Sequence, residues 1–171
     1  MEIELTLIRT FDHCSDSIVE LTALLHRSYK QLADLGYQFW ATNQTVDQTL
    51  ERIKDAKCFV SLVDGKIVGT VCFYDKTEKD DSRWYSRADV GRFGQFGVDP
   101  DYQKMGLGRA LLSIVEEYAI GIGKHHLAMD TAESAYHLIE YYSRLGFEHV
   151  EYIQWERVNY RSTVMSKRLG R

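Results

Sequence analysis

The hydrophobic positions of this chain follow two different spacings, which together predict the order of its elements. Apolar residues recur every three to four positions in four stretches, and this spacing is typical of amphipathic helices. These stretches are residues 17–36, 45–56, 106–120 and 134–145. Continuous or alternating apolar runs predict strands between and around them. The strand-like runs are residues 1–9, 58–63, 66–74, 88–98, 125–129, 148–155 and 161–169.

Short polar motifs mark the ends of several predicted elements. Ser17 and Glu20 have the spacing of a capping box at the start of the first helix, and Thr45 and Gln48 repeat it at the second. Asp64-Gly65 is a strong signal for a two-residue hairpin between two antiparallel strands. The polar run at residues 75–81 is expected to be a solvated loop.

The stretch from Val98 to Ala110 joins a predicted strand to a predicted helix through a loop that contains Gly106 and Gly108. Residues 103–115 contain no Asp or Glu, although acidic side chains are normally favoured at the start of a helix. The two glycines let the backbone approach a ligand closely, and the free N–H groups of a first helical turn suit a phosphate. Pro100, the only proline, fixes the turn before the loop.

The spacing of these glycines separates the loop from better-known phosphate loops. Leu111 occupies the place of the third glycine in a dinucleotide fingerprint, and Gly123-Lys124 is followed by His125 rather than by the Ser or Thr of a P-loop. The pattern Gln103-x-x-Gly106-x-Gly108 instead resembles the coenzyme A pyrophosphate loop of the GNAT superfamily of acyl-CoA-dependent N-acetyltransferases. Taken alone, an ordinary strand-to-helix turn that binds nothing explains the glycines equally well.

A second motif makes the resemblance more specific. Tyr142 precedes Leu145-Gly146-Phe147, which is similar to the second signature of the same superfamily, and the two motifs stand in the expected order. The resemblance implies a mixed α/β fold with one domain at residues 1–171. In this fold a mostly antiparallel sheet of about seven strands is flanked by about four helices, and a parallel strand pair splays at the acyl-CoA site. A length of 171 residues with 44% hydrophobic residues fits one domain.

Composition and charge limit the classes of partner that the protein is expected to bind. The net charge of −4 and the scattered basic residues argue against nucleic-acid binding. Cys14, Cys58 and Cys72 lack paired metal-site spacing, so we expect reduced thiols in a cytoplasmic protein and no metal. Residues 1–9 lack the apolar core of a signal peptide and no apolar run approaches membrane-spanning length, so we expect no membrane association. The sequence is compatible with a homodimer.

The resemblance implies acetyl-CoA as cosubstrate and a direct attack of an amine on its thioester. The strand before the loop would offer backbone groups to the pantetheine arm, through Gln95, Phe96, Gly97 and Val98. The loop would bind the pyrophosphate, through Gln103, Lys104, Met105, Gly106, Leu107, Gly108 and Arg109. The charged side chains of Lys104 and Arg109 could contact the phosphates or remain solvated on the surface.

By the same resemblance Tyr142 is the expected general acid, which protonates the departing thiolate. A phenol is protonated at neutral pH and can donate directly. The alternative is a core aromatic, because Tyr142 shares its stripe with Leu138 and Ile139. Tyr141 faces elsewhere on the helix and is the weaker candidate.

The general base cannot be carried over from the family. Arg92 occupies the strand position where some members place a Glu. Asp130, Glu133 and His137 lie near the expected splay and could act directly or through water, although each also has an ordinary structural explanation. Ala135 stands where some members carry an Asn that contacts the pantetheine arm.

The acceptor is expected to be a small-molecule amine or a peptide amine. In the family the pocket is often formed by the region between the first two helices and by the last hairpin, and in this chain both segments are rich in aromatic residues. These are Tyr37, Phe39, Trp40, Tyr152, Trp155 and Tyr160. They could hold an amine by cation–π contact or could simply pack in the core. A non-catalytic acyl-CoA-binding module remains the alternative to an enzyme.

Overall fold

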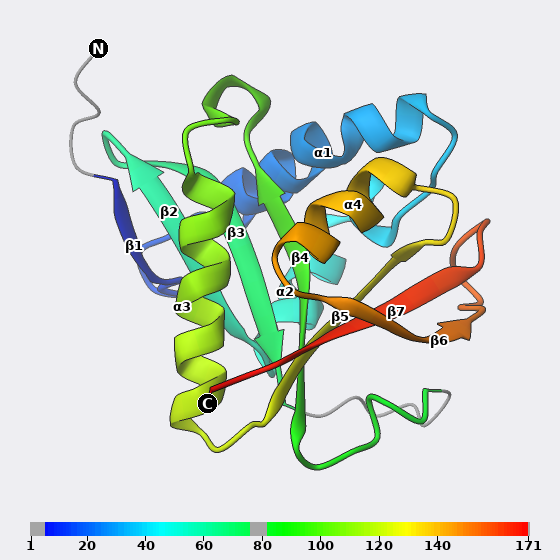
Figure 1. Cartoon of the computed structure of the whole chain (residues 1–171). Coiled ribbons are helices and arrows are strands. Elements are labelled where there is room, and N and C mark those ends of the chain that lie inside the picture. The colour runs from blue at the N-terminus through cyan, green and yellow to red at the C-terminus, as the bar shows by residue number, and fades with distance from the viewer. Residues whose placement is uncertain (1–5, 76–81, 171) are drawn as a thin grey trace.

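The computed structural model describes residues 6–75 and 82–170, which form a seven-stranded sheet with helices on both faces (Figure 1). The strand order is β1-β2-β3-β4-β5-β7-β6, and β4 and β5 form the one parallel pair of this sheet. The strands are β1 (Leu7–Thr10), β2 (Lys57–Val63), β3 (Lys66–Tyr74), β4 (Val90–Val98), β5 (His126–Ala132), β6 (Glu148–Ile153) and β7 (Ser162–Arg168). The helices are α1 (Ile18–Asp34), α2 (Val46–Lys54), α3 (Leu107–Gly121) and α4 (Tyr136–Arg144).

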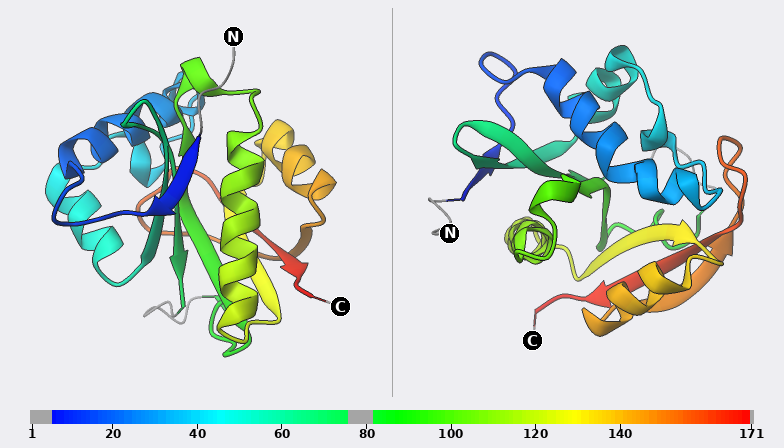
Figure 2. Two further views of the ribbon diagram at one scale, coloured as in Figure 1. Left: turned by 90° about the vertical axis from the view of Figure 1, so that its left-hand side faces the viewer. Right: turned by 90° about the horizontal axis from the view of Figure 1, so that it is seen from above.

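The helices form one layer on each face of the sheet. Figure 2 shows α1 and α2 on one side and α3 and α4 on the other. On the α3 side, Leu111 and Val115 pack with Val71 and Phe73 of β3 in the largest buried cluster. On the α1 side, Leu21 and other apolar residues pack against β2 and β3. The apolar stripes of the helices thus cover the two faces of the central strands.

The predicted order of elements is confirmed for the residues that the structure describes. The helix ends fall within two residues of the predicted bounds, but β5 continues to Ala132 and β4 begins at Val90 after a series of turns. Two short 3₁₀ helices, η1 (Trp40–Thr42) and η2 (Pro100–Tyr102), were not predicted, because three residues give no periodic signal. Residues 1–5 of the first expected strand and 76–81 of the expected loop lie outside the described residues.

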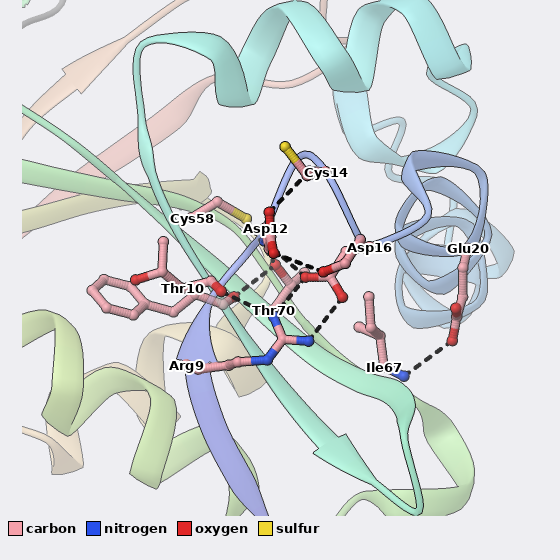
Figure 3. A network of polar contacts seen from close by, with 11 residues as sticks. Arg9, Thr10, Asp12, Cys14, Asp16, Glu20, Cys58, Ile67 and Thr70 are labelled. Atoms are coloured by element: carbon pink, nitrogen blue, oxygen red, sulfur yellow. Dashed lines mark hydrogen bonds and ion pairs between the residues drawn. The ribbon is translucent and has the colours of Figure 1, made fainter.

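One of the two predicted capping boxes is wrong. Thr45 and Gln48 form the reciprocal pair at the start of α2, as expected. Ser17 accepts a hydrogen bond from the Glu20 N–H, but the Glu20 carboxylate does not return to the cap. It instead accepts a hydrogen bond of 3.0 Å from the N–H of Ile67 on β3 (Figure 3). Glu20 therefore ties α1 to the sheet, because a strand N–H lies within its reach.

The parallel pair opens where the site is expected. Strands β4 and β5 pair only at Val90, Gly91 and Arg92, and beyond these residues they diverge (Figure 1). The register between β3 and β4 also shifts, so that Gln95 and Phe96 together stand opposite Val71. Gln95 has a φ of 46°, which marks a β-bulge. The bulge and the splay leave backbone groups of β4 free of a strand partner.

Candidate active site

A cavity of 1530 Å³ lies where β4 and β5 diverge. Its walls come from β4, the glycine loop, the first turn of α3, and α4, and on the opposite side from α1, η1, α2 and the connection between β6 and β7. Typical small-ligand sites measure about 300–1,000 Å³. This volume is sufficient for a nucleotide-bearing cosubstrate together with a second small molecule.

The cavity collects nearly all of the residues predicted to bind acetyl-CoA. Those that line it are Gln95, Phe96, Gly97, Val98, Gln103, Lys104, Gly106, Leu107, Gly108 and Arg109. Met105 is exposed and does not line the cavity. The end of β4 and the loop, which follow one another in the chain, therefore form one continuous wall of the cavity.

The side chain of Gln95 is engaged by neighbouring side chains and is not available to a ligand. The Gln95 side chain is buried, and its amide nitrogen donates to the Tyr74 hydroxyl at 2.9 Å. Its amide oxygen accepts from the side chain of Gln44 at 2.9 Å. Gly97 allows α1 to approach β4, because a Cβ atom there would lie 2.7 Å from the Cβ atom of Ser28. These contacts fix the bulged end of β4.

The loop leads directly into α3 through a glycine with positive φ. Gly106 is the N-cap of α3 with a φ of 84°, a conformation that favours glycine, and the first turn of α3 contains no acidic residue. A Cβ atom at Gly108 would lie 3.2 Å from the ring of Phe96. Gln103 donates a side-chain hydrogen bond of 3.2 Å to the carbonyl of Val98 and so ties the loop to the strand. Leu107, Gly108 and Arg109 of the first turn of α3 line the cavity, and the turn brings no acidic side chain to it.

Tyr142 lies on the wall formed by α4. Its ring packs against Phe93 and Phe147 at centroid distances of 6.1 and 5.9 Å, and only 7% of the residue is exposed. Its hydroxyl forms no hydrogen bond with the described residues. Burial raises the pKa of Tyr142 well above its ordinary value, and the nearby Tyr29, Tyr141 and Asp130 raise it further. Tyr142 is therefore both a core aromatic and a residue of the cavity wall.

Tyr141 faces another side of the helix, as expected, yet it also lines the cavity. Its hydroxyl lies 3.5 Å from the position of a Cβ atom at Gly108. Burial raises its pKa, and the charge of Arg109 opposes this shift. Tyr141 thus borders the loop, whereas Tyr142 borders β4 through Phe93.

The candidates for the general base fall into different environments. Asp130 lines the cavity, but it accepts hydrogen bonds from the Tyr85 hydroxyl at 2.7 Å and the Trp155 indole at 2.9 Å, and it pairs with Arg92 at 3.3 Å. Its oxygen atoms are therefore already engaged by donors. Glu133 does not line the cavity and pairs with Arg161 at 2.6 Å. His137 is exposed and lines the cavity.

Only part of the expected aromatic cluster belongs to the cavity. Phe39, Trp40, Trp155 and Tyr160 line it. Tyr37 lies outside and shares a hydrogen bond of 3.0 Å with Ser134, while Tyr152 on β6 is largely exposed. Sequence reasoning missed Arg52 and Arg157, which also line the cavity, because single arginines on a helix and in a hairpin normally indicate solvated positions.

The described residues contain no group of three or more His, Cys, Asp or Glu side chains that could hold a metal ion. Within residues 6–75 and 82–170, none of the helices combines the length and the apolar character needed to cross a membrane.

Comparison with known proteins assigns the chain to a family. Residues 19–147 match the family model of the Acetyltransferase (GNAT) family. The chain is 30% identical over 135 residues to S-(2-succino)cysteine N-acetyltransferase of Bacillus subtilis, and the match covers 78% of each chain. The chain therefore belongs to the GNAT family and is an N-acetyltransferase, and acetyl-CoA is the cosubstrate typical of this family.

Solved structures agree on the fold. The structure of PH1933 from Pyrococcus horikoshii matches with a TM-score of 0.75 at 22% identity and covers 98% of this chain and 100% of its own. The structure of yncA from Salmonella typhimurium, solved with acetyl-CoA, matches with a TM-score of 0.67 at 21% identity and covers 96% of this chain and 94% of its own.

Proposed function

We propose that this protein transfers the acetyl group of acetyl-CoA to an amine by direct attack of the amine nitrogen on the thioester carbon. The observation that carries the proposal is the convergence of the glycine loop, the bulged end of β4 and Tyr142 on one cavity. A second half of the same cavity, between α2 and the β6–β7 connection, leaves room for the acceptor. No covalent enzyme intermediate is required, because both reactants can be held in one site.

The chain's own residues would fix the thioester between strand and helix. The N–H groups at the start of α3 bind the pyrophosphate, and Lys104 and Arg109 add positive charge beside it. The backbone of Phe96 to Val98, where β4 has no β5 partner, binds the pantetheine arm. An N–H group near Val98 stabilises the negative charge that develops on the carbonyl oxygen.

Tyr142 is proposed to complete the transfer as general acid. When the carbon–nitrogen bond forms and the carbon–sulfur bond breaks, its hydroxyl donates a proton to the departing thiolate. The raised pKa keeps the phenol protonated at neutral pH. A thiolate released beside it would be poorly solvated as well, and this raises its own affinity for the proton.

The amine must also lose a proton when it attacks the thioester. Asp130 is engaged by Tyr85, Trp155 and Arg92, which suits a carboxylate that positions Arg92. Of the three candidates, His137 is the one that lines the cavity without a hydrogen-bond partner among the described residues. We propose that His137 accepts the proton, either directly or through water.

A panel of amines tests the proposed function. The purified protein is incubated with acetyl-CoA and one amine at a time, and free thiol release is followed. The panel includes S-(2-succino)cysteine, the compound after which a relative is named, together with amino acids, a polyamine and a peptide. Thiol release above hydrolysis with at least one amine supports the proposal. Binding of acetyl-CoA without release from any amine would favour a non-catalytic acyl-CoA-binding module.

A further inference from the structure

Two arginine side chains meet at one tryptophan in the acceptor half of the cavity. Arg52 comes from α2 and Arg157 from the connection between β6 and β7, more than 100 residues further along. The guanidinium carbon of each lies 4.4 Å from the ring centroid of Trp40 in η1. Stacking on an aromatic ring holds a guanidinium in place while its edge remains free to donate hydrogen bonds.

A buried network fixes Arg52 further. Its Nη1 atom donates to the side-chain oxygen of Gln44 at 2.5 Å. The Gln44 residue is 1% exposed, and its amide nitrogen donates to Thr49 at 2.7 Å and to Gln95 at 2.9 Å. A guanidinium has five N–H donors, so this contact leaves most of them available. The same network reaches the bulge of β4, which places Arg52 at a defined position relative to the proposed thioester site.

The two arginines lack a carboxylate partner within the described residues. Elsewhere, arginines that stack on aromatic rings also have one. Arg87 stacks on Trp84 at 4.3 Å and pairs with Asp89 at 2.8 Å. Arg161 stacks on Tyr152 at 4.1 Å and pairs with Glu133 at 2.6 Å. At Trp40 both arginines stack in the same way, but no carboxylate of the described residues pairs with them.

The acidic residues nearby do not fill this role. Glu51, Asp55 and Glu156 also line the cavity, but all three are exposed and none forms an ion pair with Arg52 or Arg157. The third arginine of this region, Arg92, already pairs with Asp130.

We propose that Arg52 and Arg157 bind a carboxylate of the acceptor, so that the substrate is an amine that also carries a carboxylate, as an amino acid or its derivatives do. Planar guanidinium groups match the geometry of a carboxylate and favour it over a neutral amide. This inference rests on the proposed function, because the arginines select the acceptor of the same transfer reaction.

The first test compares acids with their amides. For the best acceptor of the amine panel, each carboxylate is replaced in turn by a carboxamide, and kcat and KM are measured. We expect KM to rise at least about tenfold for one of these replacements. A best acceptor without a carboxylate, or amides with unchanged KM, would overturn the inference and leave the proposed acetyl transfer intact.

The second test uses variants. Arg157→Gln and Arg52→Gln should each raise the KM for the acidic acceptor about tenfold or more and shrink the difference between acid and amide. Arg157→Gln should leave the acetyl-CoA affinity unchanged. Arg87→Gln, which removes an arginine stacked on a tryptophan outside the cavity, should change neither value. Arg52 also bonds to buried Gln44, so Arg52→Gln could fail to fold. In that case Arg157→Gln, on the exposed connection, tests the inference alone. Equal selectivity in Arg157→Gln and wild type would overturn the inference.

A binding experiment tests the carboxylate site even if no amine is turned over. Succinate serves as a non-reactive dicarboxylate probe, measured by calorimetry with coenzyme A bound and compared with succinamide. We expect succinate to bind more tightly than succinamide and to lose this advantage in Arg157→Gln. Absence of succinate binding to the wild-type protein would contradict the carboxylate site, whereas absent turnover with intact succinate binding would count only against the proposed reaction.

Discussion

The hydroxyl of Tyr142 belongs to a ring that is packed in the core, so its chemical role can be separated from its packing role. The ring contacts Phe93 and Phe147 on one side, while the residue also lines the cavity. A substitution that removes only the oxygen atom keeps these ring contacts. Packing and catalysis then predict different outcomes for the same variant.

We expect Tyr142→Phe to lower kcat by about 10²-fold or more, because general acids typically contribute 10² to 10⁴. Its melting temperature and acetyl-CoA affinity should change little. The measurement is kcat under conditions where chemistry limits the rate, together with a thermal melt. Tyr141→Phe is the matched control and should retain turnover. An unchanged kcat in Tyr142→Phe would assign Tyr142 to the core alone.

Asp99 at the end of β4 is a buried carboxylate whose pairing depends on pH. Its side chain is 3% exposed and pairs with Arg27 at 2.9 Å. Burial alone would raise its pKa, but the hydrogen bond from the Asp101 N–H and the pairing with Arg27 outweigh it and lower the pKa. A carboxylate whose pKa is lower in the folded state stabilises that state at neutral pH. This contribution is lost as the pH falls below the unfolded value of about 3.9 toward the lower folded value.

Replacing Asp99 by Asn should therefore destabilise the protein by about 1 kcal/mol at pH 7, where the charge is present. The difference between Asp99→Asn and wild type should shrink between about pH 4 and pH 2, as the wild-type carboxyl becomes protonated. Urea unfolding at a series of pH values measures it. Asp101→Asn, in the same turn, is the control. A difference that stays constant over this range would exclude the ionised pair as its source.

At the scale of elements, the β4–loop–α3 unit combines a bulge, a tight loop and a helix start. The unit requires small residues at two places for different reasons. Position 106 needs glycine because of its backbone conformation, since φ is 84°. Space is not the reason, because no atom lies within 4 Å of a Cβ there. Gly108 requires space, since a Cβ there meets the Phe96 ring at 3.2 Å.

Gly108→Val should lower acetyl-CoA affinity at least about tenfold, because the added side chain covers the first N–H groups of α3 and displaces Phe96. Calorimetric titration with acetyl-CoA gives the affinity, and circular dichroism checks that the helix remains. Gly121→Ala, at the end of the same helix with nothing within 4 Å of its Cβ, is the matched control and should bind as wild type does. Equal affinities in the two variants would contradict the phosphate role of the loop.

The elements and the loop could be predicted from the sequence because their signals are local. The stripe of α3 and the pair Gly106 and Gly108 lie within one short segment, and so does Tyr142 with the Leu-Gly-Phe that follows it. The meeting of Arg52 and Arg157 at Trp40 could not be predicted, because it depends on a hairpin far along the chain folding over α2. The same applies to Glu20, whose carboxylate binds a strand N–H that only tertiary structure brings near. The bulge carries no signal, since Gln95 is not a residue type that favours positive φ.

At the scale of the whole molecule, the site lies between two separate buried clusters. The loop and Tyr142 are supported by the cluster around α3, whereas α2 with Arg52 is anchored through Ile53 in the cluster on the α1 side. The strands β3 and β4 join these halves and carry the bulge between them. A cosubstrate bound along β4 would therefore contact parts of the fold that are stabilised separately.

Acetyl-CoA should consequently raise the melting temperature of the whole domain in one transition, because it binds the native state and not the unfolded chain. At a concentration 100 times its Kd, the expected stabilisation is about 2.7 kcal/mol. For a domain of this size each kcal/mol shifts the melting temperature by about 2–4 °C, which gives roughly 5–10 °C. Calorimetric scans over a range of acetyl-CoA concentrations measure it. Pantetheine, which lacks the nucleotide and pyrophosphate, should give a much smaller shift at equal concentration, and Gly108→Val should remove most of the difference. Equal shifts from pantetheine and acetyl-CoA would show that the loop does not bind the pyrophosphate.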